Sequence, residues 1–95
     1  MTVQQSMAQR LILQIFGDVQ GIGFRYGARQ KARELRLAGF VRNEPDGSVY
    51  IEAEGEHGKL EEFLRWCRED APGRGDEVEQ EFSDKIKGFG EFEIR

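Results

Sequence analysis

Hydrophobic and polar residues follow two rhythms along this chain, one typical of strands and one typical of helices. Residues 10–16, RLILQIF, are mostly apolar, which predicts a central strand with both faces at least partly covered. From Phe24 onward, apolar residues recur at helical spacing and arginines fall on the opposite side. This second pattern predicts an amphipathic helix with a basic outer face that stops near Gly39.

The same two rhythms repeat in the second part of the chain. Residues 39–55, GFVRNEPDGSVYIEAEG, place a Pro-Asp-Gly turn between two alternating segments, which predicts a β-hairpin with Gly47 at positive φ. A second helical stripe follows, then a half-exposed strand at residues 77–82, EVEQEF, and a short last strand in FEIR at 92–95. The positions expected to face the core are Val49, Ile51 and Ala53 in the hairpin, Leu60, Phe63, Leu64 and Cys67 in the second helix, and Phe92 and Ile94 at the end.

The order of these elements predicts the fold. Strand, helix, strand, strand, helix and strand form two βαβ halves in split form, which is the ferredoxin-like βαββαβ arrangement. We therefore expect an α+β sandwich, with an antiparallel sheet, two helices on one face and a short extra C-terminal strand. Residues 1–9 are polar without periodicity and predict a flexible tail before a single domain at 10–95, so that Met1 and Met7 are both possible start residues.

Composition and length limit the function classes. The chain has 95 residues, of which 38% are hydrophobic, enough for one soluble core and too few for two domains. We expect a cytoplasmic protein without a membrane partner, because no apolar run is long enough for a membrane helix or a signal peptide. One cysteine and one histidine exclude an internal disulfide and a Cys/His zinc cluster, so we expect no metal and no cofactor. Cys67 is expected to be a core thiol, and His57, in the loop-like composition GEHGK, has nothing beside it resembling a triad.

The charge distribution points to a small anion as ligand. Of the 14 lysines and arginines, 7 lie in residues 1–50, together with only 4 of the 18 aspartates and glutamates. Residues 51–95 therefore carry a net negative charge, which disfavours a long nucleic acid as partner.

GDVQGIGFR, residues 17–25, is the stretch most suited to hold that anion. A glycine-rich turn between a strand and a helix directs successive backbone N–H groups into a small space, where the helix dipole also favours negative charge. Arg25 adds a planar fork that suits two phosphate oxygens, and its positive charge is unfavourable in a first helical turn unless an anion compensates it. The alternative is that the glycines only turn the chain and that Arg25 is a solvated residue at the helix start.

Two motifs carry a family resemblance. GDVQGIGFR resembles the acylphosphatase signature Gly-x-Val-Gln-Gly-Val-x-Phe-Arg, and GFVRNEPDGSV, residues 39–49, resembles the second conserved block of that family. The resemblance runs from about residue 10 to residue 95. It implies a ferredoxin-like fold and hydrolysis of the carboxyl-phosphate bond of small acyl phosphates, without a metal or a covalent intermediate.

The resemblance also implies roles for individual residues. Arg25 matches the phosphate-binding arginine of the family, and Asn43 matches the asparagine that orients the attacking water. The substrate phosphate is expected to lie in the loop at 18–25, against Gln20, Gly21, Ile22, Gly23, Phe24 and Arg25. The expected ligands are a small acyl phosphate as substrate and inorganic phosphate as product and inhibitor, bound by a monomer.

Two departures from the signature and two rival interpretations remain open at this point. Ile22 replaces the usual valine and should matter little, whereas the carboxylate of Asp18 should repel a phosphate unless its side chain points away. One rival is a non-catalytic ferredoxin-like anion- or RNA-binding module. KGFGEFEI, residues 87–94, begins like an aromatic RNA-binding motif, but it is terminal and lies in the acidic half. The other rival is a domain of a larger carbamoyltransferase, although no cysteine-rich segment follows Arg95.

Overall fold

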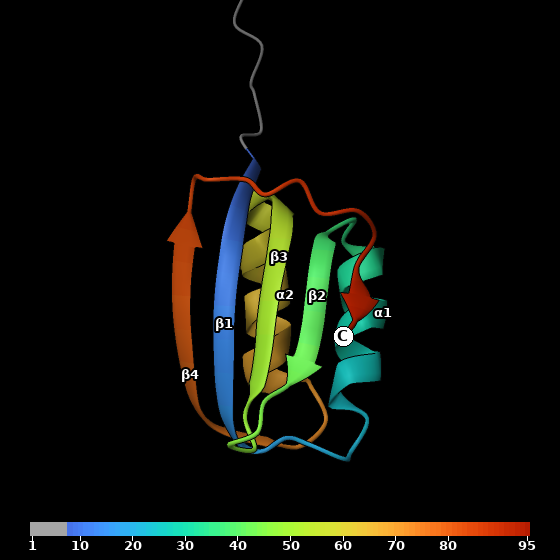
Figure 1. Ribbon diagram of the computed structural model, residues 1–95, viewed down its shortest axis with the longest axis vertical. Coiled ribbons are helices and arrows are strands. Elements are labelled where there is room, and N and C mark those ends of the chain that lie inside the picture. Colours follow the sequence, from blue (N-terminus) through green and yellow to red (C-terminus); the bar gives the residue numbers. More distant parts are fainter. Residues whose placement is uncertain (1–7) are drawn as a thin grey trace, which may run out of the picture.

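The computed structural model describes residues 8–95, so the predicted tail at 1–7 lies outside the described residues. The elements are β1 (Ala8–Asp18), α1 (Phe24–Glu34), β2 (Ala38–Asn43), β3 (Val49–Glu56), α2 (His57–Glu69), β4 (Arg74–Ser83) and β5 (Glu93–Ile94). The sheet has the order β4-β1-β3-β2-β5, and both helices cover one of its faces (Figure 1). This arrangement confirms the predicted ferredoxin-like α+β fold. β1 begins at Ala8, two residues earlier than predicted.

The pairing of the strands is antiparallel except at one edge. β1 pairs antiparallel with β3 and β4, and β2 pairs antiparallel with β3. The short β5 lies parallel to β2, with Phe40 opposite Glu93 and Val41 opposite Ile94, so the complete sheet is mixed. The predicted extra C-terminal strand is therefore present, and it extends the sheet on the side of α1 (Figure 1).

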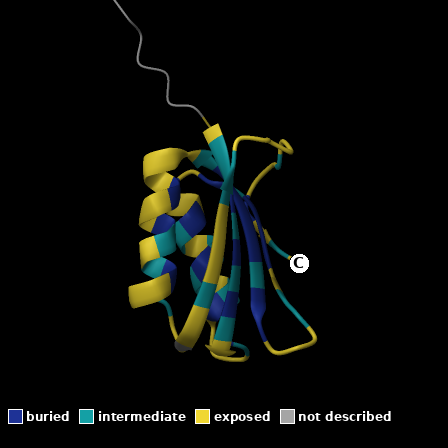
Figure 2. Ribbon diagram, turned by 90° about the vertical axis from the view of Figure 1, so that its left-hand side faces the viewer, coloured by how far each residue is buried: buried dark blue, intermediate teal, exposed yellow. Residues whose placement is uncertain are grey.

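The core lies between the sheet and the helices, as the burial pattern in Figure 2 shows. Alternate residues of β1 and β3 are fully buried, and each helix turns its apolar stripe to the sheet, as the period-2 and period-3.6 patterns require. Of the predicted inward positions, Val49, Ile51, Ala53, Leu60, Phe63, Cys67 and Phe92 are buried, while Leu64 and Ile94 are partly buried and pack against the core. Burial raises the pKa of the Cys67 thiol well above its ordinary value, in agreement with a core thiol.

α1 ends at Glu34, earlier than the predicted end near Gly39. The helix closes in a Schellman turn, in which the N–H of Leu37 donates to the carbonyl of Ala32 and the N–H of Arg36 donates to that of Arg33. Arg36 takes the left-handed position of that turn, with φ of 59°, where glycine is usual. Because an arginine stands there, the sequence lacked the ordinary signal for the end of a helix.

The start of α2 also differs from the sequence interpretation. His57 is the first residue of the helix rather than a loop residue. Its Nε2 lies 3.2 Å from a carboxylate oxygen of Glu61 one turn later, and its Nδ1 contacts Oε1 of Gln9 on β1. The glycines around His57 suggested a loop, but these side-chain contacts and the buried stripe of α2 favour the helix.

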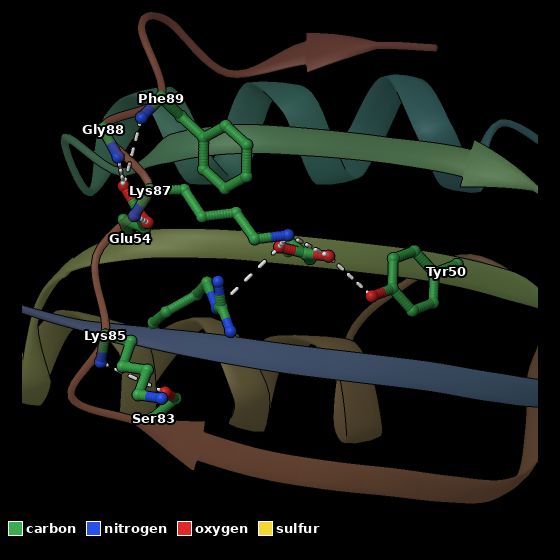
Figure 3. A network of polar contacts seen from close by, with 9 residues as sticks. Tyr50, Glu54, Ser83, Lys85, Lys87, Gly88 and Phe89 are labelled. Carbon is green, nitrogen blue, oxygen red and sulfur yellow. Dashed lines mark hydrogen bonds and ion pairs between the residues drawn. The ribbon is translucent and has the colours of Figure 1, made fainter.

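The C-terminal segment is fastened to the sheet by Glu54. This segment connects β4, at one edge of the sheet, to β5, at the other (Figure 1). The side chain of Glu54 points away from the helices, and its carboxylate accepts hydrogen bonds from the backbone N–H groups of Lys87, Gly88 and Phe89 (Figure 3). Glu54 is only 6% exposed, and these three backbone donors satisfy its buried carboxylate.

Glu52, two residues earlier on β3, supports the same connection. Its carboxylate accepts a hydrogen bond of 2.6 Å from the hydroxyl of Tyr50 and lies 3.2 Å from Nζ of Lys87 and 3.8 Å from Nε of Arg10. Burial raises the pKa of Glu52, but the hydrogen bond from Tyr50 and the charges of Lys87 and Arg10 outweigh it, so the pKa is lowered overall. Burial and the hydrogen bond to Glu52 raise the pKa of Tyr50 to about 12. The two carboxylates thus hold the crossing segment that places β5 beside β2.

Candidate active site

The loop between β1 and α1 is held by one buried side chain at each end. Val19 and Phe24 are 1% and 2% exposed, and the ring of Phe24 packs against Trp66 of α2 with centroids 5.9 Å apart. Gly21 and Gly23 between them have φ of 76° and 87°, and a Cβ at either position would meet no protein atom within 4 Å. The glycines are therefore required by backbone conformation, not by crowding, and the main chain stays open to solvent on that side.

The backbone donors of this loop are uncommitted. Within residues 8–95, the N–H groups of residues 20–25 donate no backbone hydrogen bond, and the first one of the α1 turn runs from Gly27 to the carbonyl of Gly23. Gly23 provides no side-chain cap, and the first turn of α1 has no acidic residue. The N-terminus of α1 thus presents unpaired donors and the positive end of the helix dipole.

Arg25 lies beside these donors and lines the same pocket. A pocket of about 240 Å³ is lined by Val19, Gly21, Gly23, Phe24, Arg25 and Tyr26. Among the side chains that the structure describes, none forms a hydrogen bond or ion pair with the partly buried Arg25. A positive side chain beside a positive helix end is unfavourable on its own, so the arrangement is suited to an anion with several oxygen acceptors.

Gln20 connects the loop to the β2–β3 turn. Its side-chain amide donates to the carbonyl oxygens of Glu44 and Ser48, at 2.9 Å each. The turn is stiffened by Asp46, which accepts hydrogen bonds from the backbone N–H and the hydroxyl of Ser48. These two hydrogen bonds from Ser48 lower the pKa of Asp46. Gly47 has φ of 92°, which confirms the predicted turn.

Asn43 is the residue just before this connection. It ends β2 opposite Val49, and its side-chain Oδ1 is buried without a hydrogen-bond partner in residues 8–95. A buried amide oxygen without a donor is unfavourable by about 1–3 kcal/mol, so its retention calls for an explanation. Asn43 does not line the pocket around Arg25 itself, but Gln20 links the loop to the residue next to it.

The α2–β4 connection packs closely against the β1–α1 loop at Gly73. Gly73 has φ of 95°, and a Cβ on it would lie 2.0 Å from Cδ1 of Ile22 and 2.6 Å from the carbonyl oxygen of Asp18. Asp18 ends β1, and its side chain is exposed. The site is therefore bounded by three turns, of which the sequence motifs predicted two.

Only some of the residues predicted to contact the phosphate line the pocket. Gly21, Gly23, Phe24 and Arg25 surround the pocket, whereas the side chain of Gln20 faces the β2–β3 turn and Ile22 is 40% exposed. Two pocket residues, Val19 and Tyr26, were not singled out from the sequence. The signal for Tyr26 was an aromatic residue directly after Arg25, on the polar side of the helical pattern.

The described residues offer neither a cluster of metal ligands nor a membrane-spanning helix. Residues 8–95 contain no group of three or more His, Cys, Asp or Glu side chains placed to hold a metal ion. In the same part of the chain, no helix has the length and hydropathy needed to span a membrane.

Fold and loop together define a small ferredoxin-like domain whose first strand-to-helix turn carries the candidate site. Comparison with known proteins assigns it further. The acylphosphatase family model matches residues 11–94. The acylphosphatase of Arthrobacter sp. (strain FB24) is 45% identical over 86 residues, which cover 90% of this chain and 79% of that protein. The chain belongs to the acylphosphatase family, which confirms the prediction of an enzyme of the acylphosphatase class.

Solved structures agree with this assignment. The structure of an acylphosphatase from Coxiella burnetii superimposes with a TM-score of 0.88 at 30% identity and covers 100% of both chains. Full-length HypF, in a phosphate- and nucleotide-bound form, matches with a TM-score of 0.86 at 31% identity, over 97% of this chain and 12% of that protein. The same domain therefore also occurs as a small part of a much larger protein.

Proposed function

We propose that the protein hydrolyses small acyl phosphates to a carboxylate and inorganic phosphate, with the phosphate held by the β1–α1 loop and Arg25. The observation that carries this proposal is the convergence of unpaired backbone N–H groups, a helix N-terminus and an unpartnered arginine on one pocket. Gln20, Gly21, Ile22, Gly23, Phe24 and Arg25 contribute backbone N–H donors, and Arg25 adds its guanidinium.

Asn43 orients the attacking water in this proposal. Its buried, unpartnered Oδ1 is an acceptor that a water molecule can satisfy, and an amide keeps the same donor and acceptor groups at any ordinary pH. The connection through Gln20 fixes Asn43 relative to the phosphate loop, which favours attack in line with the bond to the leaving group.

The reaction needs little more than this geometry. Water attacks phosphorus, the bond from phosphorus to the carboxyl oxygen breaks, and the electron pair leaves with the carboxylate. The two protons of the water pass to the product phosphate and solvent, so atoms and charges balance. Because the carboxylate is a good leaving group, positioning and stabilisation of charge on the phosphoryl oxygens supply most of the catalysis. No covalent intermediate and no metal are part of the proposal.

The different roles of Arg25 and Asn43 can be separated by kinetics. Hydrolysis of benzoyl phosphate is followed by absorbance in the presence of EDTA, with inorganic phosphate as a competitive inhibitor. Arg25→Ala should lose turnover and also, by isothermal titration calorimetry, the binding of inorganic phosphate. Asn43→Ala should keep inhibition by phosphate while kcat falls on the order of 10²- to 10³-fold, the usual effect of removing one well-placed hydrogen-bonding group.

Exposed Arg65 on α2 provides the matched control, because Arg65→Ala removes the same charge away from the pocket and should leave both quantities unchanged. Retained hydrolysis in Arg25→Ala would contradict the proposal. A wild-type protein that binds phosphate without hydrolysing benzoyl phosphate would instead support the non-catalytic anion-binding module.

A further inference from the structure

A second hollow lies beside the phosphate pocket, along the outer side of α1. It has a volume of about 630 Å³ and is lined by Tyr26, Arg29, Gln30, Arg33 and Glu34. Tyr26 lines both hollows, so they adjoin at this residue. Tyr26 is 63% exposed, so it is accessible to a ligand. The part of a substrate that extends from the phosphate pocket along α1 therefore passes Tyr26.

The charged side chains of this hollow differ in how far they are already paired. Nε of Arg33 donates to the carbonyl of Phe92 at 3.1 Å, and a terminal nitrogen of the same guanidinium lies 3.5 Å from Glu91. Glu34 lies 3.7 Å from Nζ of Lys31. Arg33 therefore attaches α1 to the C-terminal segment, and Glu34 is paired within α1.

Arg29 has no such commitment. Among the described side chains, none forms a hydrogen bond or ion pair with Arg29, whose guanidinium lies over the ring of Tyr26 at 5.4 Å from the centroid. Arg29 stands four residues after Arg25, so the two arginines share one face of α1, about 6 Å apart along its axis. These two guanidinium groups, without a partner among the described side chains, lie one helical turn apart, and Tyr26 lines a hollow with each of them. Such an arrangement suits a ligand that has two anionic ends and a short apolar middle.

We propose that Arg29 and Tyr26 bind the acyl group of the substrate, and that the preferred acyl phosphates carry a second anionic group, as in a monoacyl phosphate of a short dicarboxylic acid. This inference rests on the proposed function. The phosphoryl end lies in the loop with Arg25, the short methylene chain packs against the ring of Tyr26, and the distal carboxylate pairs with Arg29. Arg29 acts on binding alone and takes no part in the transfer of the phosphoryl group.

The test compares two substrates that differ in the second charge. Acetyl phosphate has none, whereas succinyl phosphate carries a distal carboxylate. At low ionic strength, the wild type should have the lower KM for succinyl phosphate. Arg29→Gln should raise the KM for succinyl phosphate about fivefold to tenfold, as expected for a charge-assisted pair in a partly open groove, and change the KM for acetyl phosphate less than about twofold.

The control is Arg65→Gln, which removes the same charge from an exposed position on α2 and should change neither KM by more than a general charge effect. Acetyl phosphate turnover near the wild-type rate verifies that Arg29→Gln is folded. Equal KM values of the wild type for both substrates, or a parallel rise of both in Arg29→Gln, would overturn the inference. Failure of the wild type to hydrolyse either substrate would instead refute the proposed function, and the inference with it.

Discussion

Gly73 offers a direct test of whether the α2–β4 connection supports the β1–α1 loop. A Cβ at this position would lie 2.0 Å from Cδ1 of Ile22 and 2.6 Å from the carbonyl oxygen of Asp18. Ile22 can turn aside, but the carbonyl belongs to the backbone that leads into the loop, so the loop must shift by several tenths of an ångström or more. In Gly73→Ala we expect overpacking to lower the free energy of unfolding by about 1–3 kcal/mol, in addition to about 1–2 kcal/mol for alanine at positive φ.

The matched control is Gly88→Ala in the C-terminal segment. Gly88 has φ of 80°, close to the 95° of Gly73, but a Cβ there would meet nothing within 4 Å. Both variants therefore carry similar backbone strain, and only Gly73→Ala presses on the loop. Urea unfolding gives the two stabilities, and inhibition by inorganic phosphate reports on the loop at a temperature where both variants are folded.

A displacement of the loop approaching 1 Å should weaken inhibition by phosphate and lower kcat/KM by up to about 10²-fold in Gly73→Ala, and leave both near the wild-type values in Gly88→Ala. The reasoning is refuted if the two variants lose equal stability and Gly73→Ala keeps wild-type inhibition by phosphate.

Asp18, Glu52 and Arg36 each allow a further test. The side chain of Asp18 is exposed, so at roughly 8 Å and a dielectric constant near that of water it repels the substrate phosphate by only about 0.5 kcal/mol per charge pair. Asp18→Asn should therefore lower KM about twofold at low salt and not at high salt. An unchanged KM at low salt would show that the carboxylate does not influence substrate binding. Because the pKa of Glu52 is lowered in the folded state, its ionisation stabilises the fold at pH values above the ordinary pKa of 4.5, and this contribution is lost as pH falls through the folded-state pKa. Urea unfolding across that pH range should show a smaller loss of stability in Glu52→Gln than in the wild type. Equal losses would contradict this prediction. Arg36→Gly should raise the free energy of unfolding by up to about 1 kcal/mol, because glycine relieves the strain at φ of 59° more than it adds chain entropy; a loss of stability by thermal unfolding would refute this.

Local patterns predicted most of the fold. The alternation in residues 39–55 and the Pro-Asp-Gly turn led to β2, β3 and Gly47 at positive φ, because local geometry decides a tight hairpin. The boundaries of the helices were harder to predict from the sequence. Arg36 stands where a glycine usually marks a Schellman turn, and the glycines around His57 are typical of a loop. The parallel pairing of β5 depends on where Glu52 and Glu54 fasten the C-terminal segment, a long-range arrangement with no local signature.

The sequence motifs indicated segments of the candidate site but not the contacts between them. The signature indicated the loop and Arg25, and the second block indicated Asn43, and the roles of these residues stay predictions. The side chain of Gln20, however, joins the loop to the β2–β3 turn, and Gly73 supports the loop from a third segment. Neither contact could be predicted from the motifs, because each depends on residues that are distant in sequence and brought together by the sheet.

The central claim is that the β1–α1 loop binds the phosphate, and amide chemical shifts during titration with inorganic phosphate test it most directly. In the ¹⁵N-labelled protein, the largest shifts should fall on the N–H groups of residues 20–25 and on Nε–H of Arg25. The N-terminus of α2 is an internal negative control, because its N-cap is Glu56, whose carboxylate disfavours an anion there. Shifts confined to the loop, and abolished in Arg25→Ala, are the predicted result. Shifts of equal size at residues 57–59, or shifts that persist in Arg25→Ala, would contradict the account.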